Sequence, residues 1–299
     1  NGYTDDIRGW DFSGADTLNA FNPDFVGDND PSINKSGPGY GHGTQVGGCA
    51  GASTNNGIGV AGVGFNTKLL FTKHFADNQP TSDRSYSSNL YQGVLYAAEN
   101  GAKIINCSWG GEYRSQVYQD IITYVTLDLG CLVVAAAGNE NTDAPLYPAA
   151  YEYVLSVAAT DKNDKRASFS NYGTTIDISA PGVAIFTTRY DNAYGNTDGT
   201  SFASPIVAGA AALVWAVFPD YTPLQVAEQL RVTADETMYT ANAAYVNKLG
   251  KGRLDVFEAV TKASPSIRAL NYKLVNELGN SAEPGDNALL YFDFINYLS

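Results

Sequence analysis

The feature of this sequence that most constrains its fold is an alternation of short apolar runs with helical patterns. Each run is apolar on consecutive residues, which is typical of a strand covered on both faces. Between the runs, apolar residues recur with a period of 3.6, and two such stretches end at the helix-stop signals Asn100-Gly101 and Gly130. The expected strands are 68–72, 103–108, 131–137, 153–158 and 176–180. This alternation predicts an α/β fold with a central, mostly parallel sheet flanked by helices.

Two further helices are expected in the second half of the chain. Thr222-Pro223-Leu224-Gln225 is a capping box with proline at the first helical position. The stretch 206–218 is apolar on every side, which predicts a buried helix. Because it stops at Pro219, it falls short of the ~18 residues that span a bilayer, and no membrane partner is expected.

The composition changes at about Ser264. Residues 271–274 and 288–294 alternate in the manner of strands, with a turn at 279–286 between them. We therefore expect residues 1–263 to form the main domain, and 264–299 to be a linker and the first strands of a truncated β-rich domain. The alternative is a terminal hairpin that packs on the main domain, because two strands alone bury little.

Charge and cysteine content exclude several classes of function. The chain has 299 residues, 18 basic and 31 acidic, for a formal net charge of −13. So acidic a protein is not expected to bind nucleic acid or an anionic membrane. The cysteines Cys49, Cys107 and Cys131 are too scattered for a disulfide framework or a zinc site and are expected to be buried thiols.

Only two histidines are present, so a serine that needs a base near neutral pH must use one of them. His74 closes an apolar run and is expected to be structural. His42 lies among glycines in Gly39-Tyr40-Gly41-His42-Gly43-Thr44, which lets backbone and substrate approach the imidazole.

Two other polar residues lie where they could act with His42. Ser201 lies in Gly199-Thr200-Ser201-Phe202-Ala203-Ser204-Pro205, directly before the buried helix, whose first turn has unpaired N–H groups that suit an oxyanion. Asn139 follows an apolar strand, and open α/β sheets place their ligand sites at such strand ends. Its carboxamide could donate a hydrogen bond to a developing negative charge.

Two motifs of other functional classes do not apply to this sequence. Gly57-Ile58-Gly59-Val60-Ala61-Gly62 matches a dinucleotide-binding pattern, but it precedes a predicted strand instead of following one. The Gly-x-Ser-x-Gly pattern of α/β-hydrolases is absent from the sequence.

His42, Asn139 and Ser201, in this order and in these motifs, resemble the subtilisin-like serine proteases, the subtilases. The resemblance covers residues 1–262 and includes Val60-Ala61-Gly62-Val63, Ser108-Trp109-Gly110-Gly111, Tyr147-Pro148-Ala149, Ala167-Ser168-Phe169-Ser170-Asn171-Tyr172-Gly173, Ala180-Pro181-Gly182 and Gly250-Lys251-Gly252-Arg253. It implies a three-layer fold, with His42 as general base, Ser201 as nucleophile, and Asn139 with the Ser201 N–H as oxyanion hole.

The family's catalytic aspartate is not evident. It should end an apolar strand before His42, but residues 7–10 include Arg8 and Gly9 and do not read as a buried strand. Asp11 is the best candidate, followed by Asp5 and Asp6, but we expect the aspartate to lie outside this chain. The intact protein would then be longer at both ends, and 1–299 a truncated or nicked form.

The resemblance also implies a substrate cleft and partners. The substrate, a protein or peptide, would pair with Ser108, Trp109 and Gly110 on one side and with Tyr86 on the other. Ala136, Gly138 and Leu146 would line a pocket that favours apolar or aromatic side chains.

The resemblance further implies secretion, or location in the cell envelope, a propeptide or missing N-terminal segment as partner, and structural calcium. Asp5, Asp28 and Asp30 are candidate calcium ligands. The alternative function is a catalytically impaired fragment or protease-like scaffold that binds peptides or surfaces.

Overall fold

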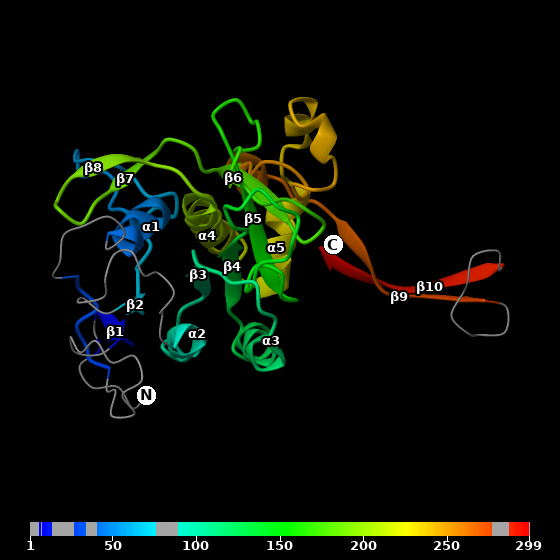
Figure 1. Ribbon diagram of the computed structural model, residues 1–299, viewed down its shortest axis with the longest axis horizontal. Coiled ribbons are helices and arrows are strands. Elements are labelled where there is room, and N and C mark those ends of the chain that lie inside the picture. Colours follow the sequence, from blue (N-terminus) through cyan, green and yellow to red (C-terminus); the bar gives the residue numbers. More distant parts are fainter. Residues whose placement is uncertain are drawn as a thin grey trace.

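The centre of the molecule is a sheet of four parallel strands in the order β3-β4-β5-β6 (Figure 1). The structure, a computed structural model, describes residues 6, 8–13, 27–33, 41–75, 89–276 and 287–298, without the side chains of 269–272. The four strands are β3 (Ile104–Cys107), β4 (Leu132–Ala136), β5 (Val154–Thr160) and β6 (Ile178–Pro181). Four of the five predicted runs form them, and β4 and β5 are buried along their whole length, as consecutive apolar residues require.

Helices cover both faces of this sheet, which makes the predicted three layers (Figure 1). Strand β4 shows why, since its side chains alternate between the layers. Leu132 and Val134 pack with helices α4 (Thr200–Val217), α5 (Pro223–Val232) and α6 (Val256–Thr261). Val133 and Ala135 pack on the other face with α2 (Leu90–Glu99), with α3 (Gln116–Thr123) and with the π-helical turn that follows α3, Tyr124–Asp128. The predicted fold class is confirmed.

A second parallel pair lies beside the four-stranded sheet. Strand β1 (Gly9–Asp11) pairs with β2 (Phe71–Lys73), and α2 packs against both β2 and β3. Within the described part of the chain no ladder joins β2 to β3, so the parallel strands form two separate sheets. Strand β2 begins three residues later than the pattern at 68–72 predicted. The prediction that 7–10 is not a strand is wrong for Gly9 and Trp10, because β2 supplies a partner that the local pattern does not reveal.

Helix α1 (His42–Gly51) packs against α4 and against β7 (Ile185–Thr188), which forms a small antiparallel pair with β8 (Tyr194–Thr197). The close approach of α1 and α4 depends on Gly209. A Cβ at this position would lie 2.9 Å from the carbonyl oxygen of Ala50 and 2.8 Å from the backbone nitrogen of Gly64. Glycine is therefore required where the two helices meet.

Helix α4 is longer than predicted, because it begins at Thr200 and not at residue 206. Its 18 residues have a mean hydropathy of 1.6, which is long and apolar enough to cross a bilayer by composition, so the prediction that this run is too short is wrong. In the structure, however, 61% of this stretch is buried against the sheet and neighbouring helices. Among the described residues no other helix has this length and hydropathy.

Several smaller predictions are confirmed. Thr222 caps α5, accepting from the Gln225 N–H at 3.3 Å, and the Gln225 side chain accepts from the Thr222 N–H at 2.8 Å. All three cysteines are buried thiols, and burial raises the pKa of Cys107 to about 12. His74 is a buried structural residue, stacked on Phe12 with ring centroids 5.2 Å apart.

The chain ends in a long antiparallel ribbon of β9 (Ser266–Asn276) and β10 (Ala288–Leu298), which extends away from the α/β core (Figure 1). Its base contacts α5, since Ser266 Oγ donates to Glu228 at 2.5 Å and Gln225 donates to the Tyr297 carbonyl at 3.0 Å. Further out, consecutive side chains of β10 such as Leu290 and Tyr291 are exposed. The ribbon confirms the predicted β-rich segment, while the domain boundary at 263 and 264 stays a prediction.

Candidate active site

Ser201 lies in the first turn of α4, at the carboxyl end of the sheet. Gly199 precedes the helix with φ of +148°, and Thr200 is its first residue. Ser108, directly after β3, contacts the same turn. Its hydroxyl donates to the Ser201 carbonyl at 2.7 Å, and the Ser201 hydroxyl donates to the Ser108 carbonyl at 3.4 Å. The N–H groups of the first turn of α4 have no intrahelical partners, which favours negative charge beside Ser201.

Thr200 connects this turn to the predicted oxyanion residue. The Asn139 Oδ1 atom accepts from the Thr200 N–H at 2.9 Å and from the Thr200 hydroxyl at 3.0 Å. The Thr200 hydroxyl also accepts from the Gly138 N–H at 3.1 Å. Because two donors engage Oδ1, the carboxamide has one defined orientation, with Nδ2 as the end that can donate to a substrate. Asn139 and Ser201 are therefore brought together, as predicted.

His42 is the first residue of α1 and is half-buried. Its ring makes an edge contact with the ring of Phe202, with centroids 5.6 Å apart at an interplanar angle of 60°. Since Phe202 directly follows Ser201, this contact places the imidazole beside the start of α4. Three distant parts of the sequence thus meet, at the starts of α1 and α4 and at the end of β4.

The two described candidates for the catalytic aspartate, Asp11 and Asp6, contact lysine, serine and tyrosine residues. The Asp11 carboxylate lies 2.8 Å from the Lys73 ammonium and accepts from the Ser13 N–H at 2.7 Å. Asp6 accepts a hydrogen bond from the Tyr96 hydroxyl at 2.9 Å. Asp5 lies outside the described residues. These contacts give Asp11 and Asp6 partners of their own, and the position of the catalytic carboxylate stays a prediction.

The predicted substrate walls adjoin the same site. The Ser108–Gly111 segment forms a bridge with the loop after β4, because Gly111 and Tyr147 exchange two backbone hydrogen bonds of 2.8 Å. Ala136 and Gly138 lie at the end of β4, opposite Gly110, and Leu146 lies between Gly110 and Gly138. Trp109 packs edge-on against Tyr91, with centroids 5.2 Å apart. Tyr86 lies outside the described residues.

Two groups of polar residues that the sequence analysis did not single out support the site. Asn171, which is buried, donates to the Ala137 carbonyl at 3.0 Å and to the Glu140 carboxylate at 2.8 Å. Near Ser201, the Ser204 hydroxyl donates to Asn106 at 2.6 Å, and Asn106 donates to Ser108 at 2.9 Å. Asn171 lies in the 167–173 motif and Ser204 in the 199–205 motif, and these motifs are the sequence signal for the two residues. Their hydrogen-bond partners lie far away in the chain, so the sequence does not show the contacts.

The candidate calcium ligands do not form a complete site in the described ranges. Asp28 and Asp11 exchange backbone hydrogen bonds, and one carboxylate oxygen of Asp28 accepts from the Asp30 N–H at 2.9 Å. Asp30 accepts from the Ser32 N–H at 3.1 Å, and hydrogen bonds from Ser32 lower the pKa of Asp30. No three His, Cys, Asp or Glu side chains converge as a metal site among these residues, and Asp5 lies outside them. Calcium needs 6–8 oxygens, so a site that includes Asp28 and Asp30 would need further oxygen ligands.

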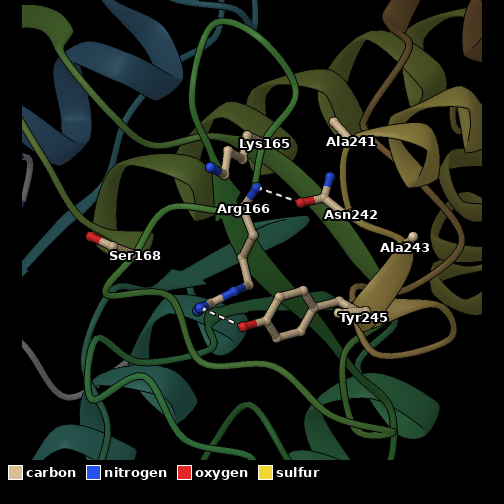
Figure 2. Close-up of a pocket in the computed structure, with 8 residues that line it drawn as sticks. Lys165, Arg166, Ser168, Ala241, Asn242, Ala243 and Tyr245 are labelled. Atoms are coloured by element: carbon tan, nitrogen blue, oxygen red, sulfur yellow. Dashed lines mark hydrogen bonds between the residues drawn. The ribbon is translucent and has the colours of Figure 1, made fainter.

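A separate pocket of about 240 Å³ lies away from the predicted site residues, between the 165–168 loop and residues 241–245 (Figure 2). The central carbon of the Arg166 guanidinium lies 5.1 Å from the ring centroid of Tyr172 and 4.4 Å from that of Tyr245. The guanidinium also donates to the Tyr245 hydroxyl at 3.0 Å. Its backbone N–H donates to Asn242 at 2.8 Å. Because the guanidinium already binds these groups, this pocket is a structural junction of loops.

Comparison with known proteins agrees with the family that the sequence motifs resemble. A thermophilic serine proteinase from Bacillus sp. (strain AK1) is 38% identical over 223 residues, which are 74% of this chain and 52% of that protein. Thermitase from Thermoactinomyces vulgaris is 38% identical over 237 residues, 79% of each chain. Among solved structures, a protease from Pseudoalteromonas arctica superimposes with a TM-score of 0.71 at 30% identity, covering 86% of this chain and 84% of that one.

The family model described as the Subtilase family matches residues 9–255, which includes His42, Asn139 and Ser201. The matched region spans about half the length of the Bacillus relative. Family match, relatives and site geometry agree, and this chain belongs to the subtilase family.

Proposed function

We propose that this chain is the core of a secreted serine endopeptidase that hydrolyses peptide bonds of proteins through an acyl-enzyme on Ser201. The observation that carries the proposal is the meeting of three elements at one point. Thr200 orients the Asn139 carboxamide by hydrogen bonds of 2.9 and 3.0 Å, and His42 contacts Phe202 beside Ser201.

The chemistry follows from these positions. His42 accepts the proton of the Ser201 hydroxyl as Oγ bonds to the substrate carbonyl carbon. The carbonyl oxygen becomes an oxyanion, which Asn139 Nδ2 and the Ser201 N–H stabilise. His42 then protonates the leaving amine as the C–N bond breaks, and the acyl-enzyme remains. Water, deprotonated by His42, hydrolyses this ester and regenerates Ser201.

The imidazolium formed in this reaction needs a carboxylate partner. Because Asp11 is paired with Lys73, we assign this role to an aspartate on a further parallel strand between β2 and β3, where the described sheet is divided. In this proposal residues 1–263 form the peptidase domain without that strand, and 264–299 begin a β-rich domain. Loss of such an aspartate costs about 10⁴-fold in kcat.

The remaining roles are proposed from the family and the walls of the site. Substrate peptides pair with Ser108, Trp109 and Gly110, and Tyr86 borders the other side. A propeptide or N-terminal segment covers the same cleft, and secretion or attachment to the cell envelope places the enzyme near extracellular proteins. Calcium, held with help from Asp5, Asp28 and Asp30, stabilises the fold.

Labelling with a fluorophosphonate tests the proposal, because this reagent reacts with an activated serine only where the base and oxyanion hole are assembled. We expect stoichiometric labelling of Ser201, found by peptide mass spectrometry, and none in Ser201→Ala. The matched control is Ser168→Ala, which changes an exposed serine outside the site and should label like the parent. Folded protein that resists labelling would contradict the proposal.

A second function, a catalytically impaired fragment or a protease-like scaffold that binds peptides, is favoured by one observation, the engagement of Asp11 by Lys73. Peptide hydrolysis by residues 1–299 should be compared with that by the product of the full gene. Slow labelling with kcat about 10⁴-fold below that of a longer gene product supports an impaired fragment. A gene product that begins at Asn1 and hydrolyses peptides rapidly would contradict both the impaired state and the missing strand.

A further inference from the structure

The glycine-rich motif 57–62 is part of an exposed loop that leaves the end of helix α1 and returns to it. The loop is closed by a hydrogen bond of 3.0 Å from the Gly62 N–H to the carbonyl of Ala52, the residue after α1. Residues 55–59, between these two anchors, are exposed. The loop lines a solvent-open hollow of about 240 Å³, so water reaches its backbone.

Within this loop, the Asn56 side chain folds back over the residues that follow it. Its Oδ1 atom accepts from the Ile58 N–H at 3.0 Å. The ring that this hydrogen bond closes contains both the Asn56 Cγ atom and the backbone nitrogen of Gly57. The same N–H can stabilise the negative charge that develops on Oδ1 when a nucleophile adds to Cγ. The carboxamide is therefore arranged as an electrophile.

Gly57 can supply the nucleophile. Its φ is +69°, and a Cβ at this position would meet no atom within 4 Å, so neither a side chain nor a neighbour hinders the approach of its nitrogen to Cγ. The Gly57 N–H makes no hydrogen bond to any residue that the structure describes. Nothing in this part of the chain has to be broken before the nitrogen can react.

The same pair of residues occurs at Asn100-Gly101, in a different environment. There the Asn100 Nδ2 atom donates to the Tyr96 carbonyl at 2.8 Å, and the Gly101 N–H donates to the Ala98 carbonyl at 3.1 Å. Both reacting groups are held at the end of α2, and local opening must release them before they can combine. A third pair, Asn1-Gly2, lies outside the described residues.

We propose that Asn56 is a site of spontaneous deamidation, with water as the co-reactant. The Gly57 nitrogen loses its proton to hydroxide and bonds to Cγ, and ammonia leaves, so that a cyclic succinimide forms. Water then opens this ring at Cγ to give aspartate, or at the backbone carbonyl to give isoaspartate. Both products add a negative charge, and isoaspartate also lengthens the backbone between the Ala52 and Gly62 anchors.

The test measures deamidation of each asparagine by peptide mass spectrometry after incubation of residues 1–299. The incubated protein carries Ser201→Ala, so self-digestion cannot remove the loop and the result does not depend on the proposed function. We expect Asn56 to deamidate at least about tenfold faster than Asn100, because the hydrogen bonds around Asn100 must open first. Isoaspartate should be among the products, and the rate should rise with pH, since the Gly57 nitrogen must lose its proton.

Two controls separate the effect of the fold from that of the sequence. In denaturant both pairs lose their surroundings, so Asn56 and Asn100 should deamidate at similar rates. Asn56→Gln, whose longer side chain cannot close the same ring with Gly57, should abolish the reaction at position 56 and leave the rate at Asn100 unchanged. Equal rates in the folded protein, an unreacted Asn56, or aspartate without isoaspartate would overturn the inference. A rate ratio that persists in denaturant would overturn it as well, because the fold would then not be its cause.

Discussion

At the scale of single residues, Thr200 decides which end of the Asn139 carboxamide is left to donate. A carboxamide has a donor end and an acceptor end, and either could face the substrate. Because Thr200 donates to Oδ1 from both its backbone and its side chain, the acceptor end is taken. An exposed asparagine becomes an oriented donor, and preorganised donors of this kind stabilise developing charge at little cost during the reaction.

The first prediction concerns this donor. Asn139→Leu keeps the approximate volume but removes the N–H group, so kcat should fall by about 10²–10³ with little change in KM. Steady-state kinetics on one peptide substrate provide the measurement. Asn163→Leu makes the same change in an exposed loop and should have parental kcat. A parental kcat in Asn139→Leu would remove this residue from the oxyanion hole.

The residue after Ser201, the proposed nucleophile, leads to a second prediction, which concerns oxidation. Phe202 directly follows Ser201, and the single methionine of the chain, Met238, is buried. Methionine sulfoxide beside Ser201 would crowd the oxyanion hole. We therefore expect activity to survive peroxide, while Phe202→Met should lose activity with time. Rapid inactivation of the parent chain by peroxide would refute this.

At the scale of elements, the geometry of the site depends on how α1 meets α4, because one helix begins with His42 and the other with Thr200 and Ser201. Their packing requires glycine at 209, where the backbone of Ala50 and Gly64 approaches most closely. Elsewhere, elements are joined by polar contacts. Arg253 binds Asp164 and Asp235 at 2.7 and 2.9 Å and so connects two loops near β6.

A third prediction follows for the α1–α4 contact. Gly209→Ala should lower the free energy of unfolding by about 1–3 kcal/mol, because the new methyl meets backbone atoms that can move away only with the whole helix. Denaturant titration measures this. Gly43→Ala is a matched helical change with no atom within 4 Å of the new Cβ, and its stability should be equal or higher. Equal stability of the two variants would show that the helices adjust freely.

The fourth prediction concerns the polar contacts and pH. Hydrogen bonds from Thr237, with Arg253 nearby, lower the pKa of Asp235 below its usual value. A depressed folded-state pKa stabilises the fold above the unfolded-state pKa of about 3.9, and this contribution disappears as pH falls through the folded-state value. Asp235→Asn should therefore cost about 0.5–1 kcal/mol at pH 7 and little near pH 2.

Unfolding curves at the two pH values measure the difference. Asp220→Asn, a change at an exposed aspartate, serves as the control and should be close to neutral at both. A cost for Asp235→Asn that is the same at pH 7 and pH 2 would rule out the proposed charge effect.

At the scale of the whole molecule, the chain combines a net charge of −13 with a long terminal ribbon outside the α/β core. The ribbon is held at its base by the buried Glu228, which accepts from Ser266 and lies 3.5 Å from Arg268. Beyond this base the ribbon exposes apolar side chains of β10. The α/β core and the ribbon therefore differ in how completely their apolar residues are covered.

The fifth prediction, about calcium, belongs to this scale. If bound calcium stabilises the folded state, removing it with a chelator should lower the thermal midpoint by about 5 °C, since a site occupied at 100 times its Kd contributes about 2.7 kcal/mol. Differential scanning calorimetry with excess calcium, with chelator, and with magnesium makes the comparison. A midpoint that chelator does not change would count against the proposed calcium.

The sequence alone determined what depends on neighbouring residues. The period of the apolar pattern placed α2 and the central strands, and the capping box at Thr222 placed the start of α5, because these signals act within one or two turns of chain. The motifs that single out His42, Asn139 and Ser201 as candidate site residues are local too. The start of α4 was missed by six residues, since its polar first turn is stabilised by residues far away in the chain.

Only the tertiary structure decided how these local pieces act on one another. Thr200 and Asn139 are 61 positions apart, so no local pattern shows that one orients the other. The partner of Asp11 is Lys73, and the methyl of Leu146 fills the space between two glycines, each from a different strand end. Such contacts depend on packing distances of a few ångströms between segments, and these are set when the sheet and its helices close around one core.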